Sequence, residues 1–151
     1  MTNSSEVSVF SIGPMDDHQT VLARILKEWL PDASARGRVA FCTTPKTVGK
    51  LHQQNRIPIV LCDGESGWRE ILDEFRTFSD PPFLIVTSRL ADDRLWSEAL
   101  NLGAYDVLAK PFDDHEVIRV LNMAWIRWIE KSSAPRLPKP PRTRAAAALF
   151  A

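Results

Sequence analysis

The sequence predicts one α/β domain built on a doubly wound, five-stranded parallel sheet with helices on both faces. Five short apolar runs alternate with segments whose apolar residues recur at helical spacing, which is the pattern of repeated βα units. Near-continuous apolar runs are typical of parallel strands that are buried on both faces. The 151 residues, 44% of them hydrophobic and 25% charged, have an ordinary globular composition and suffice for one core.

The first half of the chain supplies two strands and a helix between them. Val7–Ile12 is predicted as a strand because it is short, apolar and rich in β-branched residues. Asp16 or Asp17 provides an N-cap, and apolar residues then recur every three or four positions as far as Trp29. Arg38–Cys42 is the second predicted strand.

The same alternation continues to the end of the domain, and its breaks fall at residues that stop regular structure. The expected elements are a helix from Thr44 to about Gln54, a strand at Ile59–Cys62, a helix from Trp68 to Phe75, a strand at Phe83–Val86, a helix from Asp92 or Asp93 to Leu102, a strand at Tyr105–Ala109 and a helix from Asp113 or Asp114. Pro81-Pro82 and Gly103 separate the strands from the helices before them. The domain is expected to span residues 1–131.

Residues 132–151 form a Pro-rich, basic C-terminal tail. Four of the 19 Lys and Arg residues lie after residue 131, whereas all 19 Asp and Glu residues precede it, so the domain itself is mildly acidic. This charge balance argues against a nucleic-acid-binding surface on the domain, and the tail is too short to hold a DNA-reading helix-turn-helix unit. It is either a linker or a basic peptide that touches a partner.

Several function classes find no support in the sequence. No apolar stretch has the length of a membrane span, and the N-terminus does not resemble a signal peptide, so the cytoplasm is the expected compartment. Cys42 and Cys62 lie in strand-like runs and are expected to be buried hydrophobes. A flavodoxin-like enzyme or nucleotide binder would need a glycine-rich loop that binds phosphate, and the sequence contains none. We expect no enzyme activity.

Three polar residues follow the apolar runs at the points where chemistry is placed in parallel sheets. Asp63, Thr87 and Lys110 each end a predicted strand. Carboxyl ends of parallel strands share one edge of the sheet, so the three side chains are expected to meet there. Their order, with Pro111-Phe112 after the lysine, resembles the receiver domain of two-component response regulators, the CheY-like fold, over about residues 6–131.

The resemblance implies a flavodoxin-like sheet of strand order 2-1-3-4-5 and a role in phosphorelay signalling. Asp63 would accept a phosphoryl group from a histidine kinase or phosphotransfer protein, aided by Thr87 and Lys110. Mg²⁺ would be held by Asp63 and the backbone carbonyl of Glu65, with Asp16 and Asp17 as further candidates. The signal would pass to a downstream partner protein, without direct DNA or membrane binding. The face of the fourth helix, fifth strand and last helix could also hold a homodimer, with Trp96 and Trp125 among its candidate residues.

The chain departs from the family pattern in ways that leave two alternatives open. Gly13-Pro14 stands where an acidic pair usually follows the first strand, so Asp16 and Asp17 are either helix caps or displaced Mg²⁺ ligands. Val107 stands where an aromatic switch residue is usual. The alternative function is therefore a receiver-like interaction adaptor that works without phosphorylation. The Lys110–Pro111 bond is predicted to be cis, because a tertiary amide lowers the cost of that isomer.

Overall fold

A computed structural model describes residues 7–30, 38–43, 48–54 and 56–133 of the chain. Its elements, in order, are β1 (Val7–Ile12), α1 (Asp17–Trp29), β2 (Arg38–Cys42), α3 (Val48–Gln54), β3 (Ile59–Asp63), α4 (Trp68–Phe75), β4 (Phe83–Ser88), α5 (Asp93–Leu102), β5 (Asp106–Ala109) and α6 (Asp114–Ser133). The predicted alternation of strands and helices is confirmed throughout the described residues.

The five strands form one parallel sheet in the order β2-β1-β3-β4-β5. This confirms the predicted fold class and strand order. β3 lies at the centre, and its side chains alternate between two cores. Ile59 and Leu61 pack on one side of the sheet, whereas Val60 and Cys62 pack on the other. Both faces are buried, which is why this strand is apolar at every position before Asp63.

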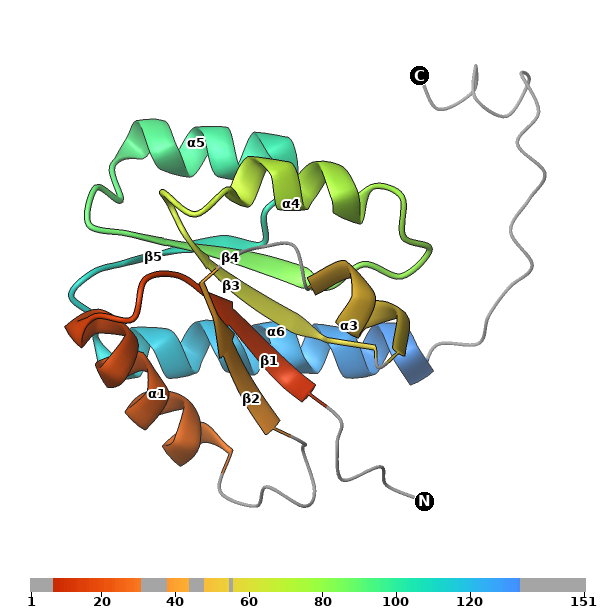
Figure 1. Ribbon diagram of the computed structural model, residues 1–151, viewed down its shortest axis with the longest axis horizontal. Helices are drawn as coiled ribbons and strands as arrows, with labels where there is room; N and C mark the ends of the chain where they lie inside the picture. Colours follow the sequence, from red (N-terminus) through yellow and green to blue (C-terminus); the bar gives the residue numbers. More distant parts are fainter. Residues whose placement is uncertain (1–6, 31–37, 44–47, 55, 134–151) are drawn as a thin grey trace.

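Helices cover both faces of the sheet (Figure 1). α1 and α6 lie together on one face, and α3, α4 and α5 lie on the other. The apolar residues that sequence periodicity assigns to the inner sides of these helices are buried: Leu22, Ile25, Leu26, Trp68, Ile71, Leu72, Val117, Val120, Leu121 and Ala124. Burial of these apolar side chains is the main source of stability for such a domain.

Three strand boundaries differ from the sequence-based expectation. β3 runs one residue further than predicted, to Asp63. β4 runs two residues further than predicted, to Ser88, because Thr87 and Ser88 still pair with β5. β5 begins at Asp106, so Tyr105 precedes the strand. α6 continues to Ser133, and the chain holds no helix breaker before Pro135. The predicted helix start at Thr44-Pro45 and the tail from residue 134 lie outside the described residues.

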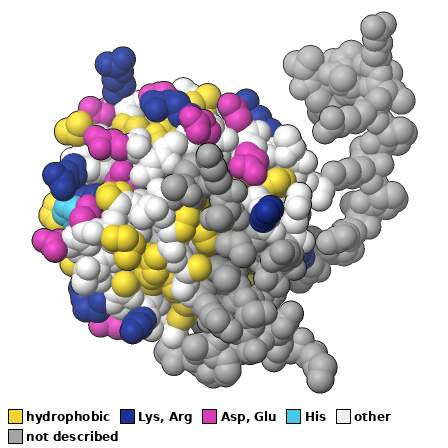
Figure 2. All heavy atoms as spheres, viewed as in Figure 1, with side chains coloured by type: hydrophobic (Ala, Val, Ile, Leu, Met, Phe, Trp, Pro, Cys, Tyr) yellow, Lys and Arg dark blue, Asp and Glu magenta, His cyan; other side chains and the backbone are white. Residues whose placement is uncertain are grey.

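The surface mixes charges of both signs. Figure 2 shows basic and acidic side chains interspersed on one face of the molecule, with no area of a single sign.

Within the part of the chain that the structure describes, no helix combines the length and the apolar character needed to cross a membrane.

Candidate functional site

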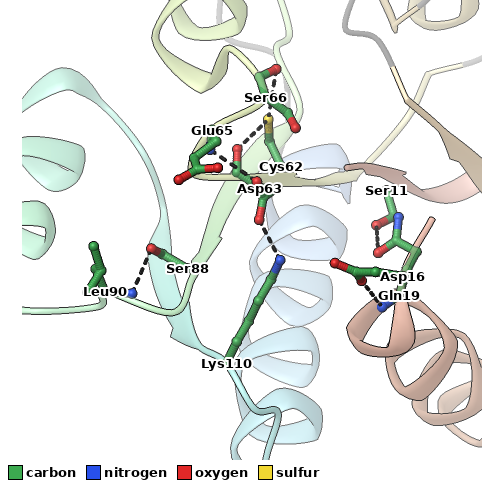
Figure 3. Close-up of polar contacts among 10 residues, drawn as sticks. All are labelled: Ser11, Asp16, Gln19, Cys62, Asp63, Glu65, Ser66, Ser88, Leu90 and Lys110. Atoms are coloured by element: carbon green, nitrogen blue, oxygen red, sulfur yellow. Dashed lines mark hydrogen bonds and ion pairs between the residues drawn. The ribbon is translucent and has the colours of Figure 1, made fainter. Parts of the chain in front are cut away.

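The three polar residues at the strand ends come together at the carboxyl edge of the sheet. Asp63 ends β3 and lies in register with Thr87 of β4, so the two residues are neighbours across the sheet. Lys110 directly follows β5, and its ammonium contacts Oδ1 of Asp63 (Figure 3). The two side chains are mostly buried, with 7% of the lysine and 13% of the aspartate exposed. The predicted meeting of an acid, a hydroxyl-bearing residue and an ammonium is therefore present.

A pocket of about 420 Å³ opens over Asp63. Its walls come from the loops that follow β1, β3, β4 and β5, as expected for an open parallel sheet. The residues that line it are Pro14, Asp16, Asp63, Gly64, Glu65, Ser88, Arg89, Leu90 and Lys110. Thr87 is buried beside Asp63 and does not line the pocket. Its neighbour Ser88 does, and the hydroxyl of Ser88 accepts the amide N–H of Leu90 at 3.0 Å.

The loop after β3 is fixed by hydrogen bonds around Asp63. Oδ2 of Asp63 accepts the amide N–H of Glu65 at 3.1 Å, and the amide of Gly64 donates to the carbonyl of Thr87 at 2.7 Å. The thiol of Cys62 donates to the carbonyl oxygens of Asp63 and Ser66. Burial, with the nearby Asp63 carboxylate, raises the pKa of this thiol to about 12, so it is held in its neutral form.

Asp16 caps α1 and also lies at the pocket. Its Oδ1 accepts the amide N–H of Gln19 at 3.1 Å and caps α1. The same residue lines the pocket, and Figure 3 shows its carboxylate to the side of the Lys110 ammonium. The Gln19 amide, with a smaller contribution from Lys110, holds the pKa of Asp16 below its ordinary value, so the carboxylate is charged near neutral pH.

Asp17 differs from its neighbour. It is the first residue of α1, its side chain is exposed, and it does not line the pocket. Of the two acids that could replace the family's usual pair, only Asp16 lines the pocket that contains Asp63.

Gly13, which follows β1, lies close to Asp63. A Cβ atom built on Gly13 would lie 3.2 Å from the Cβ of Asp63, closer than ordinary van der Waals contact. A side chain at position 13 would therefore require Asp63 or the backbone to shift by a few tenths of an ångström. Behind it, the hydroxyl of Ser11 donates to the side-chain oxygen of Gln19, and both residues are buried.

The donor set at the pocket suits Mg²⁺, which usually takes one or two carboxylates and keeps several waters. Asp16 and Asp63 supply two carboxylates, and Glu65, whose backbone carbonyl is the further candidate ligand, lines the same pocket. No group of three acidic, histidine or cysteine side chains that could hold a metal occurs among the described residues. A magnesium ion here would therefore depend on water and phosphoryl oxygens for its remaining ligands.

Sequence reasoning missed part of this site. Ser88 ends β4, and Arg89 and Leu90 follow it at the same edge as Asp63, so all three line the pocket, a placement that the strand-end rule could have indicated. The dual position of Asp16 and the close approach of Gly13 had no sequence signal, since both depend on the path of the loop after β1. The Lys110–Pro111 bond is cis, as predicted.

Comparison with known proteins identifies the family. The response regulator receiver domain matches residues 14–122. The chain belongs to this family. Receiver domains are signalling modules of two-component phosphorelays and are generally not enzymes. They interact with histidine kinases or phosphotransfer proteins and with downstream partners, and they typically bind Mg²⁺ at an acidic phosphorylation site.

Solved structures show the same fold at low sequence identity. The signal receiver domain of an HD domain-containing protein from Pseudomonas fluorescens is 18% identical, with a TM-score of 0.62 over 83% of this chain and 98% of that one. The Francisella response regulator 1452 receiver domain is 20% identical, with a TM-score of 0.60 over 79% and 96%. The signal receiver domain of a DNA-binding response regulator from Colwellia psychrerythraea is 16% identical, with a TM-score of 0.65 over 80% and 99%. No curated protein matches the sequence.

Proposed function

We propose that this receiver accepts a phosphoryl group on Asp63 and relays the signal through a protein contact. The observation that carries the proposal is the contact between Asp63 and Lys110 inside an open pocket at the carboxyl edge of the sheet. A carboxylate there can act as a nucleophile, and an ammonium beside it can stabilise the oxygens of the transferred group.

The reaction needs little from the protein beyond positioning and charge. A carboxylate oxygen of Asp63 attacks the phosphorus of a phosphohistidine, the new O–P bond forms as the N–P bond breaks, and the imidazole leaves with its electron pair and takes up a proton. Lys110 exchanges its contact with the carboxylate for one with the phosphoryl oxygens. Asp16, Asp63 and the Glu65 carbonyl would hold Mg²⁺, which when bound offsets negative charge on the phosphoryl group.

The face formed by α5, β5 and α6 is proposed as the surface for the downstream partner. Trp96 and Leu100 on α5 are 46% and 37% exposed, and they lie one helical turn apart. Exposed tryptophan is a frequent anchor of protein interfaces. The proposed function of this face is to bind a protein, and we propose no enzyme activity for the chain.

Phosphoryl uptake from a small donor tests the proposal. The full-length protein, given acetyl phosphate or phosphoramidate with millimolar Mg²⁺, should gain one phosphoryl group by intact mass. Asp63→Asn should abolish the gain, because an amide cannot form the mixed anhydride. Asp73→Asn is the matched control, since Asp73 is an exposed acid on α4 away from the pocket. Absence of labelling in the unmutated protein with any donor would instead favour the phosphorylation-independent adaptor.

A further inference from the structure

The outward face of α6 carries a stripe of residues that the fold leaves exposed. Arg119, Met123, Ile126 and Glu130 are spaced by four, three and four positions. At 100° per residue these four positions fall within about 60° of one another around the helix. This is the alternating three-and-four spacing of residues along a helix–helix seam.

The inner side of α6 is already occupied, so the stripe faces away from the core. Val117, Leu121 and Ala124 are buried against the sheet. On one flank, Nε1 of Trp29 in α1 donates to Oδ1 of Asn122 at 2.8 Å. Met123 and Ile126, by contrast, are 47% and 50% exposed at the centre of the stripe.

The ends of the stripe carry opposite charges. Arg119 and Glu130 are both exposed, and no ion pair involving Arg119 occurs among residues 7–30, 38–43, 48–54 and 56–133. The stripe therefore reads from cation through two apolar side chains to anion. When a second copy of this helix lies antiparallel to the first, the cation of each copy faces the anion of the other and the apolar side chains face each other.

We propose that α6 pairs in antiparallel fashion with α6 of a second copy of this chain. A two-fold axis between residues 124 and 125 places Met123 opposite Ile126 of the other copy and Arg119 opposite its Glu130. Each of these pairs then occurs twice, as a two-fold interface requires. The unphosphorylated protein forms this dimer, because no residue of the phosphoacceptor pocket takes part.

Charge also selects the direction of the pairing. A parallel arrangement in register would place Arg119 against Arg119 and Glu130 against Glu130. Like charges that face each other at an interface are unfavourable, whereas the antiparallel arrangement contains two opposite-charge pairs. The stripe thus disfavours the parallel dimer and favours the antiparallel one.

The contact is expected to be weak, since each copy contributes two apolar side chains at its centre. Small interfaces of this kind typically support transient association. Sedimentation velocity of the full-length protein from micromolar to millimolar concentration should accordingly show a reversible monomer–dimer equilibrium. Ile126→Asp should abolish the dimer, because it places two carboxylates at the centre of the interface.

A charge swap gives the sharper test. Arg119→Glu and Glu130→Arg, made singly, should each weaken dimerisation by about tenfold or more, since each change creates two like-charge pairs. The double variant should recover the original dissociation constant, because the swapped stripe is again self-complementary in the antiparallel direction. Arg94→Glu on α5 is the matched control and should leave the dimer unchanged.

Three outcomes would overturn the proposal. They are a protein that stays monomeric at every concentration, a dimer that tolerates Ile126→Asp, and a double variant no better than the single ones. A dimer lost on Trp96→Ala but kept in the α6 variants would place self-association on α5 instead. Circular dichroism of each variant checks that the fold is intact. Phosphoryl uptake, measured separately, stays informative whichever result is obtained.

Discussion

His52 illustrates how a single buried side chain links the fold to pH. Its Nδ1 accepts the amide N–H of Ile57 at 3.1 Å, and its Nε2 donates to the carbonyl of Asp80 at 2.8 Å. The ring also stacks on Phe78, with centroids 5.0 Å apart. These bonds require the neutral tautomer protonated on Nε2, because a proton on Nδ1 would face the Ile57 N–H. Burial, with the nearby Arg56 and Lys131 cations, lowers the pKa of His52.

The lowered pKa predicts a loss of stability in acid. The unfolded chain takes up a proton on His52 below the ordinary pKa of 6.5, whereas the folded protein resists it until a lower pH. Stability contributed by this residue is therefore present above pH 6.5 and falls as the pH drops below it. Urea unfolding at pH 7 and pH 5 should show a smaller pH-dependent loss in His52→Gln than in the unmutated protein. Equal losses in both would show that His52 is not the residue responsible.

At the scale of the elements, helix ends do more than terminate helices. Asp16 caps α1 and Asp92 caps α5, in each case by accepting the amide N–H three residues later. Gly103 ends α5 with a φ of 110°, a left-handed conformation that favours glycine. Of these caps, only Asp16 also lines the pocket over Asp63. A substitution of Asp16 that keeps the helix cap but removes the carboxylate charge therefore tests metal binding separately from helix capping.

Asp16→Asn is expected to keep α1 stable while weakening Mg²⁺ binding. Asparagine caps helices about as well as aspartate, so the free energy of unfolding should change by less than about 0.5 kcal/mol. Loss of one of two carboxylates should lower the Mg²⁺ affinity at least tenfold, measured by isothermal calorimetry on the unphosphorylated protein. Asp16→Ala should lose both properties, including about 1 kcal/mol of stability. Asp17→Asn is the control. A larger loss of Mg²⁺ affinity in Asp17→Asn than in Asp16→Asn would indicate that Asp17 is the metal ligand.

The elements were predictable because local signals and the global fold agree. Cap residues, the glycine after α5 and the alternating apolar runs each indicate the same boundaries that the sheet imposes. Asp63, Thr87 and Lys110 could be brought together in advance because parallel strands place their carboxyl ends at one edge. The position of Asp16 could not, since it follows from the path of Gly13-Pro14-Met15, which no periodic pattern specifies.

At the scale of the whole molecule, the opposite edge of the sheet is closed by aromatic rings and charges. Trp128 of α6 packs edge-on against Phe83 of β4, with centroids 6.1 Å apart. Arg56 lies 5.0 Å from the centroid of the Trp128 ring, and Lys131 lies 5.6 Å from it. Asp80 forms ion pairs with both of these cations. This cluster fixes α6 to the sheet at the end away from Asp63.

The cluster predicts that two tryptophans of one molecule contribute very differently to stability. Trp128 is 7% exposed, so Trp128→Ala should lower the free energy of unfolding by about 3–5 kcal/mol, as for other large core truncations. Trp96 is 46% exposed, and Trp96→Ala should change it by about 0.5 kcal/mol or less. Chemical denaturation followed by circular dichroism measures both. Similar losses in the two variants would contradict the assignment of Trp128 to the core.

Cys62 is a natural chemical probe of the loop that follows β3. Its buried thiol donates to backbone oxygens on both sides of Gly64 and stays protonated because its pKa is about 12. Alkylating reagents attack thiolates, so the closed loop is almost inert to them. Reaction at Cys62 becomes possible when the loop lifts and the thiol meets water. The alkylation rate at this position, resolved from that at Cys42 by peptide mapping, therefore measures how often the segment beside Asp63 opens.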